Sequence, residues 1–574
     1  TAVWIAENNA LPSVPQPASE GFFVPETDAD WLGQEAAQPP LYYILASLFV
    51  RPFAFEMSQA QAKTLHNPFV LLGDASAPAN RNAFVHAYDN LRENPAGHVW
   101  AAHLLRALSA VVGLGTLSLI YASARLLWPS HPRRALLAMG LVAFLPQFAF
   151  QHSAISNDVL VTFLATAVLY QLIRLERHPP RWGHFILLGL TIGLTGLTKN
   201  QGTALLVYAL GFIVARALGE TRPWGASLKR LLLVALPALA LIGPLWWRNY
   251  QLYGDITAVN QFVILAGGDR GYTLLQVLAE TPGLWLSLFA NFGWFNILAP
   301  AWVYWFWTGL VILAIVGAIW QFFNAMTQRS KEKKEKATPR RNFIFSLPVL
   351  LAGWVVLVYA SLALFMMRTP AAQGRLLFPA LLPLALGMAY GLAQLAHQLG
   401  WRKRTLRQQN ALLIAHYSLL ILINLFCLTA VLRPVYAAPP MFTADTLPHI
   451  DYPLDITYPE LGRLLGYNLS SQSLEADTPL KVTLFWESNG RTERPVTEFV
   501  QVVSEDGRRV AGVDTYHGRG NHSTAQWQSN QTFADELWLT PDPATQPSSC
   551  YPAALRLNAG LRGHDGAELT TTQG

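Results

Sequence analysis

The sequence has little charge and almost no cysteine. Only 13% of its 574 residues are charged, against about 25% in an average soluble protein. This deficit argues against an ordinary soluble domain and is the first indication of a membrane protein. The two cysteines cannot form a disulfide framework, because Cys427 lies in an apolar run and Cys550 near the C-terminus; we predict no disulfide.

Signatures of soluble enzymes are also missing. The chain has no Walker A loop, no glycine pattern for dinucleotides and no HExxH motif. It opens at Thr1 without methionine, without a signal-peptide pattern and without an apolar run ahead of its first loop. We therefore expect the true N-terminus, and the helix that delivers this loop across the membrane, to lie upstream of Thr1.

What the chain does have is long apolar runs. Ten of them approach the ~20 residues that a ~30 Å hydrocarbon core requires. They lie at about 102–128, 135–150, 156–175, 184–198, 202–218, 230–247, 302–324, 344–367, 376–398 and 410–431. They predict a mainly α, polytopic membrane protein of about ten spanning helices, eleven with the missing first one. The 19 Trp and 19 Tyr suit its two water–lipid interfaces.

Lys and Arg in the short loops predict the orientation. Five basic loops lie at 133–134, 174–181, 216–230, 329–341 and 402–407. They alternate along the chain with the other connections between the predicted helices. Counting helices between them places all five on one side, which the positive-inside rule identifies as the cytoplasm. The net charge of +6 is therefore read as an orientation signal, and we expect no nucleic-acid partner. The predicted location is the plasma membrane.

Three regions follow from this topology. Residues 1–101 form a first extracytoplasmic loop, 102–433 the transmembrane helical domain, and 434–574 an extracytoplasmic domain. The apolar stretch 41–50 is only ten residues long, so we interpret it as a helix in the outer interface. After about residue 440, short alternating segments at 481–486, 498–503 and 536–539 predict an all-β sandwich.

Ionisable residues at the outer membrane boundary are candidates for function. Asp158 opens a predicted helix in the triplet Ser-Asn-Asp, where it could equally cap that helix. Lys199, in a polar break between two short helices, could meet a lipid-linked phosphate or extend to the interface as an anchor. Arg248 and Arg375 also lie at outer helix ends, and arginine binds phosphate in a bidentate fashion.

The first loop supplies one more carboxylate. Glu35 lies three residues before the segment Gln38-Pro39-Pro40, and the prolines favour an extended entry into the interfacial helix. Glu35 should therefore be held near the membrane surface, where it could act as a base or bind a cation.

An ordered series of short motifs resembles a known family. They are QPPLYY at 38–43, LLRALSAVVG at 104–113, FLPQ at 144–147, SND at 156–158, LTK at 197–199, WWRNYQLYGD at 246–255, FGW at 292–294 and GRLLFP at 374–379. Their order resembles the bacterial C-type glycosyltransferases (the GT-C fold), relatives of the protein O-mannosyltransferases and of the aminoarabinose transferase that acts on lipid A. The tail also resembles the β-sandwich appended to many such proteins.

The resemblance implies an inverting transferase. Its donor would be a sugar on a polyprenyl phosphate, a membrane lipid, and its acceptor an extracytoplasmic glycan, lipid or protein. The main catalytic acid of the family would fall upstream of Thr1. The chain departs from its relatives at Ala37 and at Gln38, where they often carry His and Lys, so the phosphate role passes to Lys199, Arg248 and Arg375.

The remaining site residues are assigned on the same basis. Glu35 and Asp158 are the candidate catalytic residues in the chain and the candidate ligands of a divalent cation, Mg²⁺ or Mn²⁺. The candidate substrate-binding residues are Gln38, Tyr42, Asn157 and Asn200.

Two other functions are compatible with such a sequence. The chain could be a structural or accessory subunit of a larger membrane complex that keeps the GT-C fold without its activity. A transporter would instead show inverted repeats and charges at mid-membrane. The sequence shows no repeat, and its notable charges lie at the predicted outer boundary.

Overall fold

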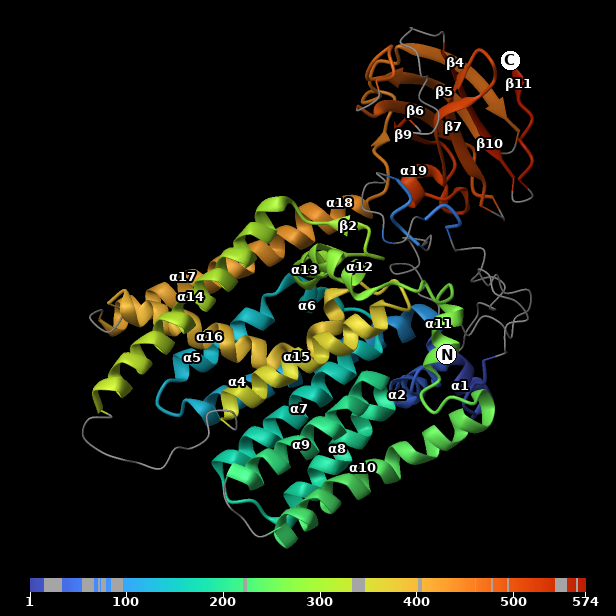
Figure 1. Cartoon of the computed structure of the whole chain (residues 1–574). Helices are drawn as coiled ribbons and strands as arrows, with labels where there is room; N and C mark the ends of the chain where they lie inside the picture. Colours follow the sequence, from blue (N-terminus) through green and yellow to red (C-terminus); the bar gives the residue numbers. More distant parts are fainter. Residues whose placement is uncertain are drawn as a thin grey trace. The chain divides into compact units, whose positions relative to one another are not determined.

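The structure is a computed structural model of the whole chain (Figure 1). It describes residues 1–14, 34–53, 67–70, 73, 79–83, 97–219, 224–332, 346–400, 405–459, 461–475, 478–492, 495–541, 555–563 and 566–573. By its contacts the chain divides into two compact units. Unit 1 comprises Thr1–Phe55, Gly97–Ala290 and Ala299–Cys427, and unit 2 comprises Glu56–Ala96, Asn291–Leu298 and Leu428–Gly574. The boundaries at 101 and 433 remain predictions.

Unit 1 is helical. Its helices, drawn from blue to orange in Figure 1, are α1 (Ala2–Asn8), η2 (Gln34–Ala37), α2 (Leu41–Val50), α4 (Gly97–Leu127), α5 (Pro132–Ala143), α6 (Pro146–Gln151), α7 (Asn157–Arg177), α8 (Trp182–Thr198), η4 (Asn200–Thr203), α9 (Ala204–Gly219), α10 (Trp224–Tyr253), α11 (Val259–Leu265), α12 (Leu274–Ala279), α13 (Thr281–Phe289), α14 (Ala301–Glu332), α15 (Leu347–Met366), η6 (Gly374–Ala380), α16 (Leu381–Gln398) and α17 (Leu406–Phe426). Each predicted apolar run lies mainly in one or two of these helices, as far as its residues are described.

Eight helices in the described part of the chain are long and apolar enough to cross a membrane. The chain is thus a multi-pass integral membrane protein, with two of the ten predicted spans shorter than expected. The run 184–198 is α8, a helix of 17 residues. The run 135–150 is broken into α5 and α6, because Pro146 has no backbone N–H and forces Leu145 out of helical geometry, to ψ 117°.

Glycines allow the closest helix contacts. Helix α8 packs on both α7 and α10, and a Cβ added at Gly189 would lie 2.3 Å from the Val234 carbonyl oxygen of α10. Helices α14 and α16 are equally close: a Cβ added at Gly317 would lie 2.0 Å from the Gly391 carbonyl oxygen, and one added at Gly391 would lie 1.9 Å from the Ala314 carbonyl oxygen. Small residues of this kind permit van der Waals packing between membrane helices. The contact at Gly189 holds α8 against α10, and Lys199 directly follows the last residue of α8.

The stretch 41–50 is the helix α2, as predicted. One side of α2 is buried, with Tyr42, Tyr43 and Ala46, while Leu48 and Phe49 are exposed. Its location in the outer interface remains a prediction. Cys427 is a free, buried thiol, and Cys550 lies outside the described residues.

Unit 2 contains the β-structure, of which the strands β4 to β11 are drawn in orange and red in Figure 1. Its elements after the π-helical turn Cys427–Leu432 and α18 (Arg433–Val435) are β3 (Met441–Phe442), β4 (Tyr452–Tyr458), β5 (Gly462–Leu469), β6 (Leu480–Ser488), β7 (Thr497–Ser504), β8 (Arg509–Thr515), α19 (His517–Gly520), η9 (Thr524–Gln526), β9 (Gln531–Leu539), β10 (Leu555–Arg562) and β11 (Thr572–Gln573). A short hairpin, β1 (Asn291–Phe292) and β2 (Ile297–Leu298), also belongs to it.

The strands form two antiparallel sheets, in the orders β11-β4-β5-β6-β9-β3 and β10-β7-β8. The longest pairing joins β6 and β9 from Leu480↔Leu539 to Ser488↔Gln531. Inward-facing side chains of both sheets, including Trp486, Val500 and Phe533, share one hydrophobic core. The predicted strands at 481–486, 498–503 and 536–539 lie within β6, β7 and β9, so the all-β prediction is confirmed.

Part of the first loop belongs to unit 2 and contacts its strands through buried asparagines. The Asn80 side-chain N–H donates to the Asp514 carbonyl at 2.8 Å, and its carbonyl oxygen accepts from the Thr515 hydroxyl at 2.8 Å. The Asn80 backbone N–H donates to the Arg519 carbonyl at 3.2 Å. The Asn67 amide, fully buried, also donates to the Asn80 side chain. We refer to this set as the asparagine clamp.

Candidate functional site

Asp158 lies in the first turn of α7 and forms ion pairs with two cations. Lys199 Nζ contacts its Oδ1, and Arg375 Nε lies 3.3 Å from its Oδ2. The helix is capped by Ser156 instead, whose hydroxyl accepts from the Asp158 N–H at 3.2 Å. Of the two roles considered for Asp158, the structure assigns capping to Ser156 and leaves the Asp158 carboxylate for the cations.

Lys199 is held where α8 stops and η4 begins. Its backbone is extended, at φ −159° and ψ 144°, and its carbonyl accepts from the Gly202 N–H at 2.8 Å. A Cβ at Gly202 would lie 2.4 Å from the Thr195 carbonyl oxygen, so this tight break requires glycine. The break directs Lys199 toward Asp158.

Arg375 is positioned by the residue before it. The Gly374 N–H donates to the Ser287 hydroxyl of α13 at 2.7 Å, and a Cβ at Gly374 would lie 2.2 Å from the Leu288 nitrogen. The Gly-Arg pair therefore presses η6 against α13. Arg375 remains 30% exposed, whereas the Asp158 side chain is only 5% exposed.

Gln38 and Asn157 extend this cluster toward the first loop. The Asn157 amide donates to the Gln38 side-chain oxygen, and Asn157 is the direct neighbour of Asp158 in α7. Nearby, Tyr42 and Tyr43 meet edge to face at 5.5 Å between ring centroids and pack with Ile5. The motif at 38–43 thus reaches the start of α7.

Arg248 occupies a neighbouring pocket rather than the ion-pair cluster. Its guanidinium donates to the Pro12 carbonyl at 2.7 Å and to the Leu11 carbonyl at 3.3 Å. Gln38 and Tyr43 line the same pocket. Because Gln38 also bonds Asn157, one side chain links the Arg248 pocket to the Asp158–Lys199–Arg375 cluster.

Two predicted residues are placed differently. Asn200 donates to the Thr257 carbonyl at 2.8 Å, a contact that ties η4 to the loop after α10. Glu35 is exposed on η2. The described residues contain one group of three possible metal ligands, Glu498, His517 and Asp535 of unit 2. Neither Glu35 nor Asp158 belongs to it, so cation binding by these two residues remains a prediction.

Sequence reasoning missed several residues of this region. Asn249 and Tyr253 line the pocket with Arg248, and the Tyr253 hydroxyl accepts from the Val14 N–H at 3.0 Å. Both residues belong to the motif at 246–255, so a signal for them was present. The carbonyls of Leu11 and Pro12 had no signal, because main-chain contacts across more than 200 residues leave no mark in sequence.

The charges of the cluster are unequal. Within the described contacts, two cations face one buried carboxylate. Such an arrangement has positive charge in excess and suits an anion with several oxygens, because guanidinium and ammonium groups both donate to phosphate. The charge and the position of this site at helix ends therefore suit a phosphate group.

One family model matches part of the chain. Residues 87–253 match the family model described as dolichyl-phosphate-mannose-protein mannosyltransferase, a segment that contains Asp158, Lys199 and Arg248. This match confirms the resemblance to GT-C glycosyltransferases that the sequence motifs predicted. No curated protein shows significant similarity to the chain.

Two solved structures are also similar. They are crystal structures of ArnT from Cupriavidus metallidurans, one in the apo state and one bound to undecaprenyl phosphate. Identity is 14% and 15%, the matches cover 69% of this chain and 70% and 71% of those chains, and the TM-score is 0.29 in both.

Proposed function

We propose that the protein transfers a sugar from a polyprenyl-phosphate donor to an acceptor outside the cytoplasm. The observation that carries this proposal is the convergence of Lys199 and Arg375 on the Asp158 carboxylate. The match of residues 87–253 to the mannosyltransferase family supports it. ArnT, a different protein, has been crystallised with undecaprenyl phosphate, a lipid of the class that we propose here.

In the proposed reaction an acceptor hydroxyl attacks the anomeric carbon of the sugar. The bond from that carbon to the phosphate oxygen breaks, and polyprenyl phosphate leaves with the electron pair. Lys199 and Arg375 stabilise the charge that develops on the leaving phosphate, which is the main way such a site lowers a barrier. Arg248 supports the same headgroup from the neighbouring pocket.

The carboxylates have different roles in this proposal. Both Oδ atoms of Asp158 face cations, so Asp158 orients Lys199 and Arg375 rather than accepting a proton. Glu35, being exposed, is the candidate in the described chain for receiving the proton of the acceptor. Gln38 and Asn157, which bond to each other, and Tyr42 hold the substrate in this proposal. The C-terminal domain lies outside the cytoplasm.

Binding of undecaprenyl phosphate to the detergent-purified protein tests the proposal. Native mass spectrometry should detect the lipid on the wild type, and Lys199→Ala or Arg375→Ala should weaken its binding at least tenfold. Arg368→Ala is the matched control, because Arg368 pairs with the exposed Asp269 at 2.8 Å. Equal binding by all four proteins would overturn the assignment of the site.

Transfer itself distinguishes an enzyme from an accessory subunit. Membranes that contain the wild type should convert a radiolabelled polyprenyl-phosphate sugar into a product insensitive to mild acid, and membranes that contain Arg375→Ala should not. Lipid binding without any turnover would favour the accessory role.

A further inference from the structure

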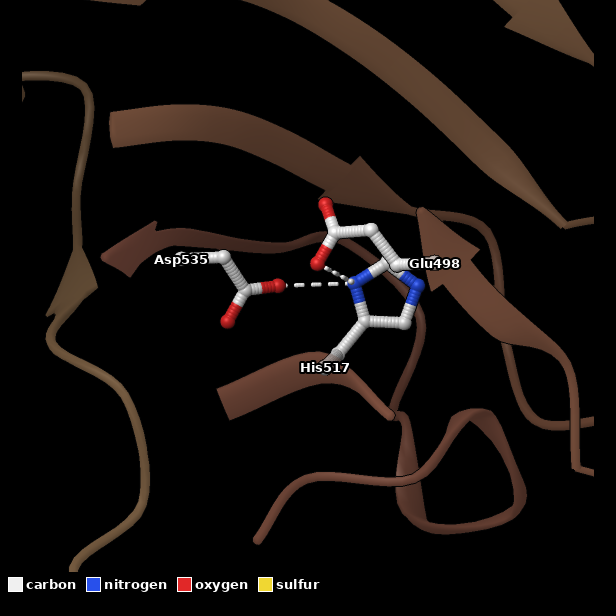
Figure 2. Close-up of side chains that lie close together, drawn as sticks. All are labelled: Glu498, His517 and Asp535. Atoms are coloured by element: carbon white, nitrogen blue, oxygen red, sulfur yellow. Dashed lines mark hydrogen bonds and ion pairs between the residues drawn. The ribbon is translucent and has the colours of Figure 1, made fainter. Parts of the chain in front are cut away.

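Three ionisable side chains meet inside the core of unit 2 (Figure 2). Glu498 comes from β7, Asp535 from β9 and His517 from α19, and each side chain is 0% exposed. Their potential ligand atoms lie within 4.8 Å of one another. The proposed transfer reaction does not use them.

In each carboxylate, one oxygen accepts a hydrogen bond from a protein N–H and the other oxygen lies toward the His517 imidazole. The Trp486 indole N–H donates to Glu498 Oε1 at 3.1 Å, and the Gly518 N–H donates to Asp535 Oδ1. The second oxygens, Asp535 Oδ2 and Glu498 Oε2, lie 2.7 and 3.6 Å from His517 Nδ1, as Figure 2 shows. Protein donors that orient ligand groups from behind are typical of metal sites.

Glu498 Oε2 is the second observation that points to a ligand. It is completely buried, and in the described part of the chain it accepts no hydrogen bond. It is aimed at the point that Asp535 Oδ2 and His517 Nδ1 share (Figure 2). A buried carboxylate oxygen without a donor is costly, so this point calls for a positive charge.

The surroundings supply no such charge. The ring of His517 packs against Trp527, Trp486 and Phe533, with centroids 4.7, 5.2 and 5.9 Å away. Among the described residues no Lys or Arg forms an ion pair with Glu498 or Asp535. Two carboxylates and a neutral imidazole become electrically neutral when they share one divalent cation.

We propose that Glu498, His517 and Asp535 bind a divalent transition-metal ion in the core of unit 2. One imidazole nitrogen and two carboxylate oxygens form a donor set that zinc accepts. Ligand atoms at ~2.1 Å in tetrahedral geometry are separated by about 3.4 Å. The 3.6 Å separation already fits, and the 2.7 Å separation must widen by roughly 0.7 Å.

The ion would stabilise the turn that follows β8. Gly518, Arg519 and Gly520 adopt positive φ of 64°, 60° and 92°, a run that L residues rarely adopt. The ligand His517 begins this turn, and the ligand Asp535 accepts from its Gly518 N–H. The same turn contacts the asparagine clamp, because the Arg519 carbonyl accepts a hydrogen bond from the Asn80 backbone N–H.

Metal content of the full-length protein tests the proposal. Protein purified in detergent without a polyhistidine tag should retain about one equivalent of metal after exposure to Zn²⁺ and desalting, measured by inductively coupled plasma mass spectrometry. Glu498→Gln and Asp535→Asn should retain less than a tenth of that amount. The control is Glu536→Gln, which alters the neighbouring residue of β9, paired with Lys481 at 2.6 Å; it should bind like the wild type.

A measurement on the wild type alone guards against variants that fail to fold. Protein loaded with Co²⁺ should show visible d–d absorption, which Zn²⁺ should abolish by displacement. A wild type that retains no Zn²⁺ and shows no Co²⁺ band would overturn the proposal and leave a proton as the occupant of the cluster. Equal metal retention by the wild type and the Glu498 and Asp535 variants would also overturn it.

Discussion

The two charged clusters of this protein are opposites. In unit 1, two cations face one carboxylate, and Arg375 is 30% exposed. In unit 2, two carboxylates face one imidazole, and all three side chains are 0% exposed. The sign of the excess charge indicates what each cluster can bind, and the exposure indicates whether the ligand can exchange. The first suits a phosphate that comes and goes, the second a cation that stays.

Burial also affects the acid–base behaviour of the second cluster. Burial, and then the nearby charge of Asp535, raises the pKa of Glu498 well above its usual range. Burial of this kind disfavours the charged form of the carboxyl, and a cation beside it favours that form. The comparison between the clusters therefore depends on what neutralises Glu498.

The largest effect should come from removing the imidazole. We expect His517→Asn to lower the free energy of unfolding of unit 2 by about 3–5 kcal/mol, because two buried carboxylates lose their common partner. Thermal unfolding of the purified chain, followed by tryptophan fluorescence, would measure the change. A melting temperature unchanged from the wild type would show that the cluster contributes no stability.

The next effect should appear in unit 1 and affect activity more than stability. Lys199→Ala should reduce kcat by about 10²–10³-fold, the usual loss when one donor to a developing anion is removed. The loss of stability should be smaller than in His517→Asn, because Arg375 remains beside the Asp158 carboxylate. A collapse of stability with normal turnover in the folded fraction would reverse the roles of the two clusters.

A smaller effect is expected where the first loop meets unit 2. Asn80→Ala removes three side-chain hydrogen bonds, so the Asp514 carbonyl loses the Asn80 donor and the Asn67 amide and Thr515 hydroxyl lose the Asn80 acceptor. The expected cost is about 1–3 kcal/mol, measured by hydrogen exchange of β8. Asn468→Ala is the control, because this half-buried side chain of β5 bonds to the Asp451 N–H and the His449 carbonyl and belongs to the other sheet; it should leave β8 unchanged.

The smallest effect should follow from Arg248→Lys. Lysine keeps the charge but loses the planar guanidinium that reaches the Leu11 and Pro12 carbonyls. We expect KM for the donor to rise about tenfold, equivalent to ~1.4 kcal/mol, with kcat nearly unchanged. A fall of kcat comparable to that in Lys199→Ala would place Arg248 among the groups that contact the reacting phosphate.

Local signals predicted the helices and strands well. Apolar runs and period-two alternation depend on neighbours in sequence, so α7, α10, β6 and β7 were all anticipated. The break of the run 135–150 also has a local signal, the pair Leu145-Pro146. It was not predicted, because the spanning helices were assigned from the length of the apolar runs alone. The asparagine clamp could not be anticipated, because it joins Asn80 to residues more than 400 positions away.

The candidate sites show the same limit. Asp158, Lys199 and Arg375 attracted attention because charges at helix ends are rare in apolar sequence, and the structure brings these three together. Glu498 lies in a predicted alternating strand, where a polar residue is expected to face water, and Asp535 lies just before the predicted strand at 536–539. Only the register of β7 and β9 reveals that they point inward.

The asparagine clamp has a practical consequence for dissecting this protein. Residues before and after the membrane helices share hydrogen bonds within unit 2. A fragment that starts near residue 440 would lack Asn80, and the Thr515 hydroxyl and the turn at 517–520, which contact it in the intact chain, would become exposed to solvent. The β-structure should therefore be expressed together with the segment at 67–83, for example by fusing the two through a flexible linker.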